Sequence, residues 1–156
     1  MVTTQRITPC LWFADEAEAA AQFYTAIFKN SRITKTSRSA GSVMVVAFEL
    51  DGHAFTALNG GPVFKFNEAI SLQVSCETQD EIDYYWTKLG DGGDPKAQQC
   101  GWLKDRYGLS WQVVPRNMGE IFGGGDAAGA ARAMEAMRRM KKIDIAALER
   151  ARDAGT

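Results

Sequence analysis

The chain has 156 residues, of which 46% are hydrophobic and 24% are charged, as in a folded globular protein. The net charge of -1 argues against a non-specific nucleic-acid binder, because such proteins carry a basic excess. The sequence has no apolar run long enough to span a membrane, and its first residues lack the apolar core of a signal peptide. The three cysteines are widely spaced and form no CxxC pair. We therefore expect no disulfide framework, no nucleic-acid or membrane partner, and a cytoplasmic location.

The first half of the chain reads as a strand, a helix and three further strands. Residues 6–13 alternate as a strand does, and Pro9 favours an edge position for it. A helix is expected to begin with Asp15 as its N-cap and to end near Phe28. The remaining strands are expected over residues 32–38, 43–50 and 53–58. Asp51-Gly52, between the last two strands, is the strongest hairpin signal in the sequence.

The second half repeats this order of elements. A strand over residues 69–75 precedes a helix that Thr78 caps, with Glu81 completing a capping box. A loop, a short segment near residues 97–100 and a final strand follow. The final strand is expected over residues 109–114. The repeat predicts two half-modules, about 6–60 and 69–115, within a single domain over residues 1–117.

Residues 118–156 form a different kind of sequence. A glycine-rich linker is expected first, and then a helix over residues 128–140 that carries several methionines on one face. A second helix, over residues 144–152, is capped by Asp144. Such helices need a surface to cover. That surface is either the sheet of the same chain or a partner subunit.

Three strings between residues 6 and 152 resemble a known protein family. They are ALNGGPVFKFNEAISLQVSCET, QCGWLKDRYGLSWQVVP and AMRRMKKIDIAALERA. They resemble the PhnB-like (demethylubiquinone methyltransferase-like) branch of the vicinal oxygen chelate superfamily, which contains glyoxalases, bleomycin-resistance proteins and extradiol dioxygenases. The resemblance implies an α+β fold of paired βαβββ modules forming a cupped mixed sheet, assembled as a homodimer. In metal-dependent members each half supplies two ligands to one divalent ion.

The positions that this resemblance assigns to metal ligands carry unsuitable side chains. They fall at or next to Thr8, near Ala57, near Ala69, and on Gln112. First-row divalent metals prefer imidazole, carboxylate or thiolate ligands, and one amide oxygen does not make a site. We therefore expect no metal cofactor. A metal bound through other residues is the alternative.

Strand alternation predicts a cavity wall of aromatic, amide and hydroxyl groups, which is a composition typical of a small-molecule pocket. It groups Thr8, Cys10 and Trp12 with Ala57 and Asn59 in the first half. In the second half it groups Ser71 and Gln73 with Ser110, Gln112 and Val114, and Trp111 is expected to add stacking area. The candidate ligand-binding residues are Cys10, Trp12, Asn59, Phe66, Ser71, Gln73, Cys100, Trp102 and Gln112. Alternatively, Gln73 and Gln112 only bond to each other across the sheet.

No catalytic residue is identified from the sequence. His53 is the only histidine and follows the predicted turn, so we expect it in solvent at the start of a strand. Cys100 has no base beside it in the sequence. The first hypothesis is a metal-independent protein of the resistance type that binds a small molecule. The alternatives are a metal-dependent lyase, isomerase or dioxygenase, and a methyltransferase that uses S-adenosylmethionine, although no glycine-rich strand-to-helix turn for that cofactor is found.

Overall fold

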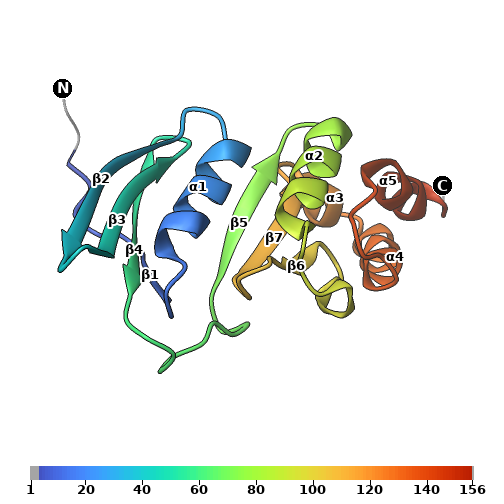
Figure 1. Cartoon of the computed structure of the whole chain (residues 1–156). Coiled ribbons are helices and arrows are strands. Elements are labelled where there is room, and N and C mark those ends of the chain that lie inside the picture. The colour runs from blue at the N-terminus through green and yellow to red at the C-terminus, as the bar shows by residue number, and fades with distance from the viewer. Residues whose placement is uncertain (1–3, 156) are drawn as a thin grey trace. The chain divides into compact units, whose positions relative to one another are not determined.

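The computed structural model describes residues 4–155, so residues 1–3 of the predicted domain and Thr156 of the predicted tail lie outside it. The chain forms two compact units that join between Phe66 and Asn67. Each unit contains a mixed sheet and a helix that follows the first strand of that sheet (Figure 1). The predicted α+β class is confirmed. None of the helices in the described part of the chain is long and apolar enough to cross a membrane.

The first unit is a complete βαβββ module. Its elements are β1 (Cys10–Phe13), α1 (Ala17–Ile27), β2 (Arg32–Ser39), β3 (Ser42–Leu50) and β4 (His53–Asn59). The strands lie in the order β1-β4-β3-β2, and β1 is parallel to β4. Helix α1 lies against this sheet (Figure 1). Tyr24 of α1 and Phe48 of β3 are buried and stacked, with their ring centroids 6.3 Å apart.

The predicted hairpin at Asp51-Gly52 is confirmed. Both turn residues have positive φ angles, of 50° and 79°, and Leu50 pairs with His53 across them. Two consecutive left-handed residues are the geometry of a type I′ turn, which matches the twist of the two strands that it joins.

The helix start in this unit differs from the prediction. The N-cap residue of α1 is Glu16, and no side chain of its own segment caps the helix, so Asp15 is not the cap. Instead, Asn59 at the end of β4 accepts a hydrogen bond from the backbone N–H of Ala17 at 2.9 Å. The cap comes from a residue 42 positions away in the chain, which a local sequence pattern does not reveal.

The second unit has the same order of elements, but a single bridge stands in place of one strand. Its elements are β5 (Ser71–Cys76), α2 (Gln79–Gly90), the 3-10 helix η1 (Pro95–Ala97), β6 (Trp102–Lys104) and β7 (Ser110–Pro115). The strands lie in the order β5-β7-β6. The short segment expected near residues 97–100 forms only a single bridge between Gln99 and Trp102, closed by Cys100 and Gly101 with positive φ angles. Pro95 opens a helical turn in the preceding segment, which shortens the room for a strand.

The predicted capping box at the start of α2 is confirmed in its main part. The hydroxyl of Thr78 accepts a hydrogen bond from the backbone N–H of Glu81 at 3.2 Å. The Glu81 carboxylate reaches back and accepts from the N–H of Glu77 at 2.9 Å. Two donors at the helix start are therefore satisfied by side chains.

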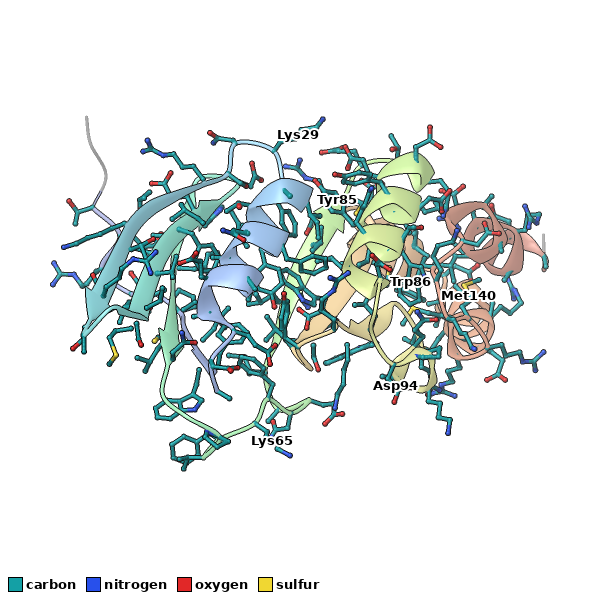
Figure 2. All side chains as sticks on the ribbon, viewed as in Figure 1. Lys29, Lys65, Tyr85, Trp86, Asp94 and Met140 are labelled. Atoms are coloured by element: carbon teal, nitrogen blue, oxygen red, sulfur yellow. The ribbon has the colours of Figure 1, made fainter. Side chains whose placement is uncertain are left out.

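The residues after β7 belong to the second unit and pack against the rest of it. They form α3 (Met118–Gly123), α4 (Ala127–Arg138) and α5 (Ile145–Asp153), which we call the tail. The prediction of a linker is wrong over α3, where Ile121 is buried with Ala133, Ile143 and Leu148. Met140 packs against this cluster and lies where the tail meets the rest of the unit (Figure 2).

Hydrogen bonds join the tail to the sheet and to α2. The backbone N–H groups of Cys100 and Gly101 donate to the carbonyl groups of Met140 and Lys141, both at 2.8 Å. The side chain of Gln79, the first residue of α2, donates to the Ile143 carbonyl and accepts from the Ile145 N–H, each at 2.9 Å. Of the two surfaces considered for these helices, the tail covers the one on its own chain.

Candidate functional site

The sheet of the second unit has one apolar face and one polar face. The apolar face carries Leu103, Trp111 and Val113, which are buried, and α2 packs on this sheet. The strand register brings the polar residues of three strands to the opposite face, because paired residues point to the same side. We call this set the polar face: Ser71, Gln73, Trp102, Lys104, Ser110 and Gln112.

Hydrogen bonds join three of these side chains. The amide of Gln112 donates to the hydroxyl of Ser71 at 2.8 Å. Gln73 donates to the Gln112 oxygen at 3.5 Å, which is at the outer limit for such a bond. The two glutamines therefore do meet across the sheet, as the alternative interpretation held. Gln73 is exposed and only weakly held, so it is free to turn toward another partner.

A recess of about 370 Å³ lies beside this network, within the second unit. It is lined by Glu68, Ala97, Gln99, Trp102, Leu103, Lys104 and Ser110. The sequence patterns did not single out Lys104, whereas Glu68 was a candidate for the mouth of the cavity. The alternation of Trp102, Leu103 and Lys104 on β6 carries the signal for the lysine, since it places Trp102 and Lys104 on the same face.

Lys104 and Glu68 form an ion pair at this recess. The Lys104 side chain is 27% exposed and that of Glu68 is 64% exposed. The hydrogen bond from Lys104 holds the pKa of the Glu68 carboxyl below its usual value. The recess thus contains one positive and one negative charge from this pair, and the negative one is the more exposed to solvent.

Ser110 is the unusual member of the lining. Its side-chain oxygen is buried, and the residue is 1% exposed. Among residues 4–155, this hydroxyl has no hydrogen-bond partner. Buried hydroxyl groups are normally bonded, because losing water without gaining a partner costs free energy. The Ser110 hydroxyl is therefore an exception to the usual pairing of buried polar atoms, and it lies on the wall of the recess.

Replacing Ser110 with alanine is expected to raise the free energy of unfolding by about 1 kcal/mol, because the variant no longer buries an unsatisfied hydroxyl. Urea unfolding followed by circular dichroism measures this change. Ser75→Ala, at an exposed position on β5, is the matched control and should leave stability nearly unchanged. A loss of stability in Ser110→Ala would show that the hydroxyl does have a partner in the folded chain.

Trp111 does not belong to this wall, contrary to expectation. It is buried on the apolar face, and its indole N–H donates to a carboxylate oxygen of Asp105 at 2.9 Å. The other oxygen of Asp105 accepts from the backbone N–H groups of Tyr107 and Leu109, at 2.8 and 3.1 Å. Trp111 and Asp105 therefore form a structural link inside the second unit.

In the first unit, the expected grouping of cavity residues is partly wrong. Leu11 pairs with Ala57 and Phe13 pairs with Asn59, so Ala57 and Asn59 point away from the side of Cys10 and Trp12. Ala57 is fully buried. Besides capping α1, Asn59 donates to the Val43 carbonyl at 3.1 Å. Asn59 therefore has a structural role at the helix start.

Trp12 and Phe66 hold the segment after β4 in place. The Trp12 indole donates to the Gly61 carbonyl at 2.9 Å, and its ring meets Phe64 edge-on at 5.0 Å. A Cβ atom on Gly60 would lie 2.2 Å from the Trp12 ring, so the glycine permits this close packing. Phe66 meets the ring of Phe13 edge-on at 5.3 Å.

The first unit also has a recess, of about 650 Å³, near the start of α1. Its charged lining consists of Asp15, Glu18 and Arg38, and Arg38 pairs with Glu18 at 3.3 Å. Of its two amide side chains, Asn59 is committed to the helix cap and Gln22 is exposed on α1. We therefore place the candidate site at the polar face of the second unit.

The three cysteines differ in accessibility. Cys10 is exposed, Cys100 is half-buried and Cys76 is buried. Cys100 lies in the turn between Gln99 and Trp102, and neither Cys100 nor Cys10 is part of the recess lining. Burial, with a smaller contribution from Glu81, raises the pKa of the Cys76 thiol to about 12.

Alkylation should therefore discriminate among the thiols. At about pH 8, iodoacetamide is expected to modify Cys10 first and Cys76 last, because only the accessible thiolate reacts. Peptide mass spectrometry over a time course gives the order, and urea-unfolded protein, in which all three should react alike, is the control. Equal rates for Cys10 and Cys76 in the folded protein would contradict the burial of Cys76.

The residues at the expected metal positions do not fit a metal ion. Thr8 and Ala69 are exposed, Ala57 is buried and apolar, and Gln112 is bonded to Ser71. Within residues 4–155, no group of three or more His, Cys, Asp or Glu side chains is placed to hold a metal. His53 is exposed at the start of β4, and its Nδ1 atom lies 3.1 Å from the Asp51 carbonyl oxygen. We assign no chemical step to a metal.

The sequence model of the family named 3-demethylubiquinone-9 3-methyltransferase matches residues 5–114. The chain belongs to this family. A solved PhnB protein from Bacillus cereus, which carries the same methyltransferase name, is 37% identical, with 71% of this chain and 99% of that chain covered and a TM-score of 0.64. The tail lies beyond the part of the chain that the family model matches.

More distant structures share the fold of this family. Protein PA1353 from Pseudomonas aeruginosa is 17% identical, covering 72% of this chain and 98% of that chain, with a TM-score of 0.57. The fosfomycin resistance protein FosX from Listeria monocytogenes, solved with Mn(II) and sulfate, is 15% identical, covering 76% and 95%, with a TM-score of 0.54. No curated protein matches the chain.

Proposed function

We propose that this chain is a metal-independent, small-molecule-binding protein of the glyoxalase/bleomycin-resistance type, and that its ligand lies on the polar face of the second unit. The observation that carries the proposal is the buried, unpartnered hydroxyl of Ser110 on the wall of the recess. A ligand oxygen or nitrogen atom bonded to this hydroxyl would remove the cost of burying it.

The rest of the recess supports the same role. Its volume lies within the usual range for small-molecule pockets. Trp102 supplies an aromatic surface, and Ser110 and Lys104 supply polar groups that would orient a ligand. Gln73, which is exposed on the same face of the sheet, would add a further amide contact to a ligand that extends beyond the recess.

A screen of small aromatic compounds against metal-stripped protein tests this proposal. We expect compounds that bind to shift the backbone NMR signals of β6 and β7. Trp102→Ala should weaken binding about tenfold, because stacking of a ligand ring on an aromatic side chain contributes substantially to affinity. Trp86→Ala, on α2 outside the recess, is the matched control (Figure 2). Binding shifts that map elsewhere, or equal weakening by both variants, would overturn the proposal.

The two enzymatic alternatives have tests of their own. Metal analysis after incubation with Ni²⁺, Mn²⁺, Zn²⁺ or Fe²⁺ tests the lyase, isomerase or dioxygenase alternative, and one tightly held ion per chain would favour it over our proposal. The family name raises the methyltransferase alternative. Both strand-to-helix turns, at residues 14–16 and 77–78, lack glycine. Saturable binding of S-adenosylmethionine in a calorimeter would nevertheless establish that alternative.

We further propose that the protein works as a homodimer, as its family resemblance implies. Light scattering after size-exclusion chromatography tests the assembly. A mass equal to one chain across the accessible concentration range would overturn this part of the proposal without affecting ligand binding.

A further inference from the structure

The charged groups at the recess narrow the class of ligand, taking the binding role proposed above as given. Lys104 and Ser110 are paired residues on the neighbouring strands β6 and β7, so both side chains leave the same face of the sheet. Both line the recess, together with Trp102. A cation, a hydroxyl group without a partner and an aromatic ring therefore surround one space.

Glu68 neutralises this cation from an exposed position. It lies before β5, outside any helix or strand, and its side chain is 64% exposed. An ion pair with so exposed a partner contributes little free energy, since the carboxylate regains water when it turns away. Glu68 can therefore leave Lys104 at low cost.

Asp105, which follows Lys104 in the sequence, is engaged elsewhere and does not take the place of Glu68 as the partner of Lys104. Asp105 is buried, and its oxygen atoms accept hydrogen bonds from Tyr107, Leu109 and Trp111. Asp105 is bonded to the indole of Trp111, which lies on the apolar face, whereas Lys104 belongs to the polar face. If Glu68 turned away, an anion from outside the chain could take its place beside Lys104.

We propose that the recess binds a small aromatic carboxylate. The carboxylate of this ligand replaces Glu68 as the partner of the Lys104 ammonium group, and it accepts a hydrogen bond from the Ser110 hydroxyl. Its ring lies along Trp102. Glu68 acts as an internal counterion that keeps the empty recess neutral and that the ligand displaces.

Benzoate and its neutral analogue benzamide are suitable probes. In NMR titrations of the full chain, benzoate should bind with shifts on β6 and β7, and benzamide should bind at least about tenfold more weakly. Lys104→Met should weaken benzoate binding by about tenfold, and Ser110→Ala should weaken it several-fold. Glu68→Gln should tighten benzoate binding, because it removes the competing carboxylate. Lys88→Met, at an exposed site on α2, is the matched control and should change nothing.

The tightening by Glu68→Gln is the decisive result, because a merely structural ion pair would not produce it and because this exposed substitution does not threaten folding. Equal affinity for benzoate and benzamide would overturn the inference, and so would unchanged or weaker binding in Glu68→Gln. An absence of saturable benzoate binding would also overturn it. None of these outcomes removes the broader proposal, which is decided by the compound screen and the Trp102→Ala variant.

Discussion

Replacing Asp105 with alanine is expected to lower the free energy of unfolding of the second unit by about 3 kcal/mol. Asp105 is 3% exposed, and its two oxygen atoms accept from two backbone N–H groups and the Trp111 indole. Removing the carboxylate leaves these three donors without that acceptor in a buried place. Burying these donors without a partner lowers stability more than removing an exposed charge does.

Urea unfolding, followed by tryptophan fluorescence, measures the loss. Hydrogen exchange at the amides of Tyr107 and Leu109 should accelerate in the variant, since both amides donate to Asp105. Asp80→Ala, at an exposed position in the first turn of α2, is the matched control and should cost about 0.5 kcal/mol or less. A loss in Asp105→Ala no larger than that of the control would contradict the structural role of this carboxylate.

Replacing Ile143 with alanine is expected to cost about 3 kcal/mol and to loosen the tail. Ile143 is fully buried in the cluster formed with Ile121, Ala133 and Leu148. Its side chain also fills the space beside Gly101, where a Cβ atom would lie 2.8 Å from the Ile143 Cδ1 atom. Truncation removes these contacts and leaves a cavity between the tail and the sheet.

Hydrogen exchange distinguishes loosening of the tail from a general loss of stability. The amides of Cys100 and Gly101, which donate to tail carbonyl groups, should exchange faster at urea concentrations where β5 and β7 remain protected. Ile70→Ala, at a 63% exposed position of the same unit, is the matched control. If Cys100 and Gly101 exchanged as in the unmodified chain, the tail would not depend on Ile143.

Features set by neighbouring residues were predictable from the sequence. The turn at Asp51-Gly52 needs two residues that tolerate positive φ angles, and the cap at Thr78 needs only a hydroxyl before the helix. The alternation within β5 that places Ser71 and Gln73 on one face is equally local. Those residues were therefore brought together as expected.

Features that depend on pairing between distant segments were not predictable. Alternation within one strand does not tell which residue of β4 lies beside Phe13, and the observed register puts Asn59 on the side opposite to Trp12. The glycines around α3 favour a linker, but burial of Ile121 in the tail cluster stabilises a helix there. Glu68 lies in an irregular segment, so no periodicity connects it to Lys104.

The short bridge at Gln99 has a consequence for how the chain behaves among copies of itself. Strand edges with free amide groups invite pairing with other molecules, and many proteins protect such edges. Here the edge beyond β6 carries no full fourth strand, and the tail carbonyl groups of Met140 and Lys141 take up the amides of Cys100 and Gly101. The tail thus takes up amide groups at this edge that could otherwise pair with another molecule. A chain ending near Asn117 would lose this protection together with the cover over Val114.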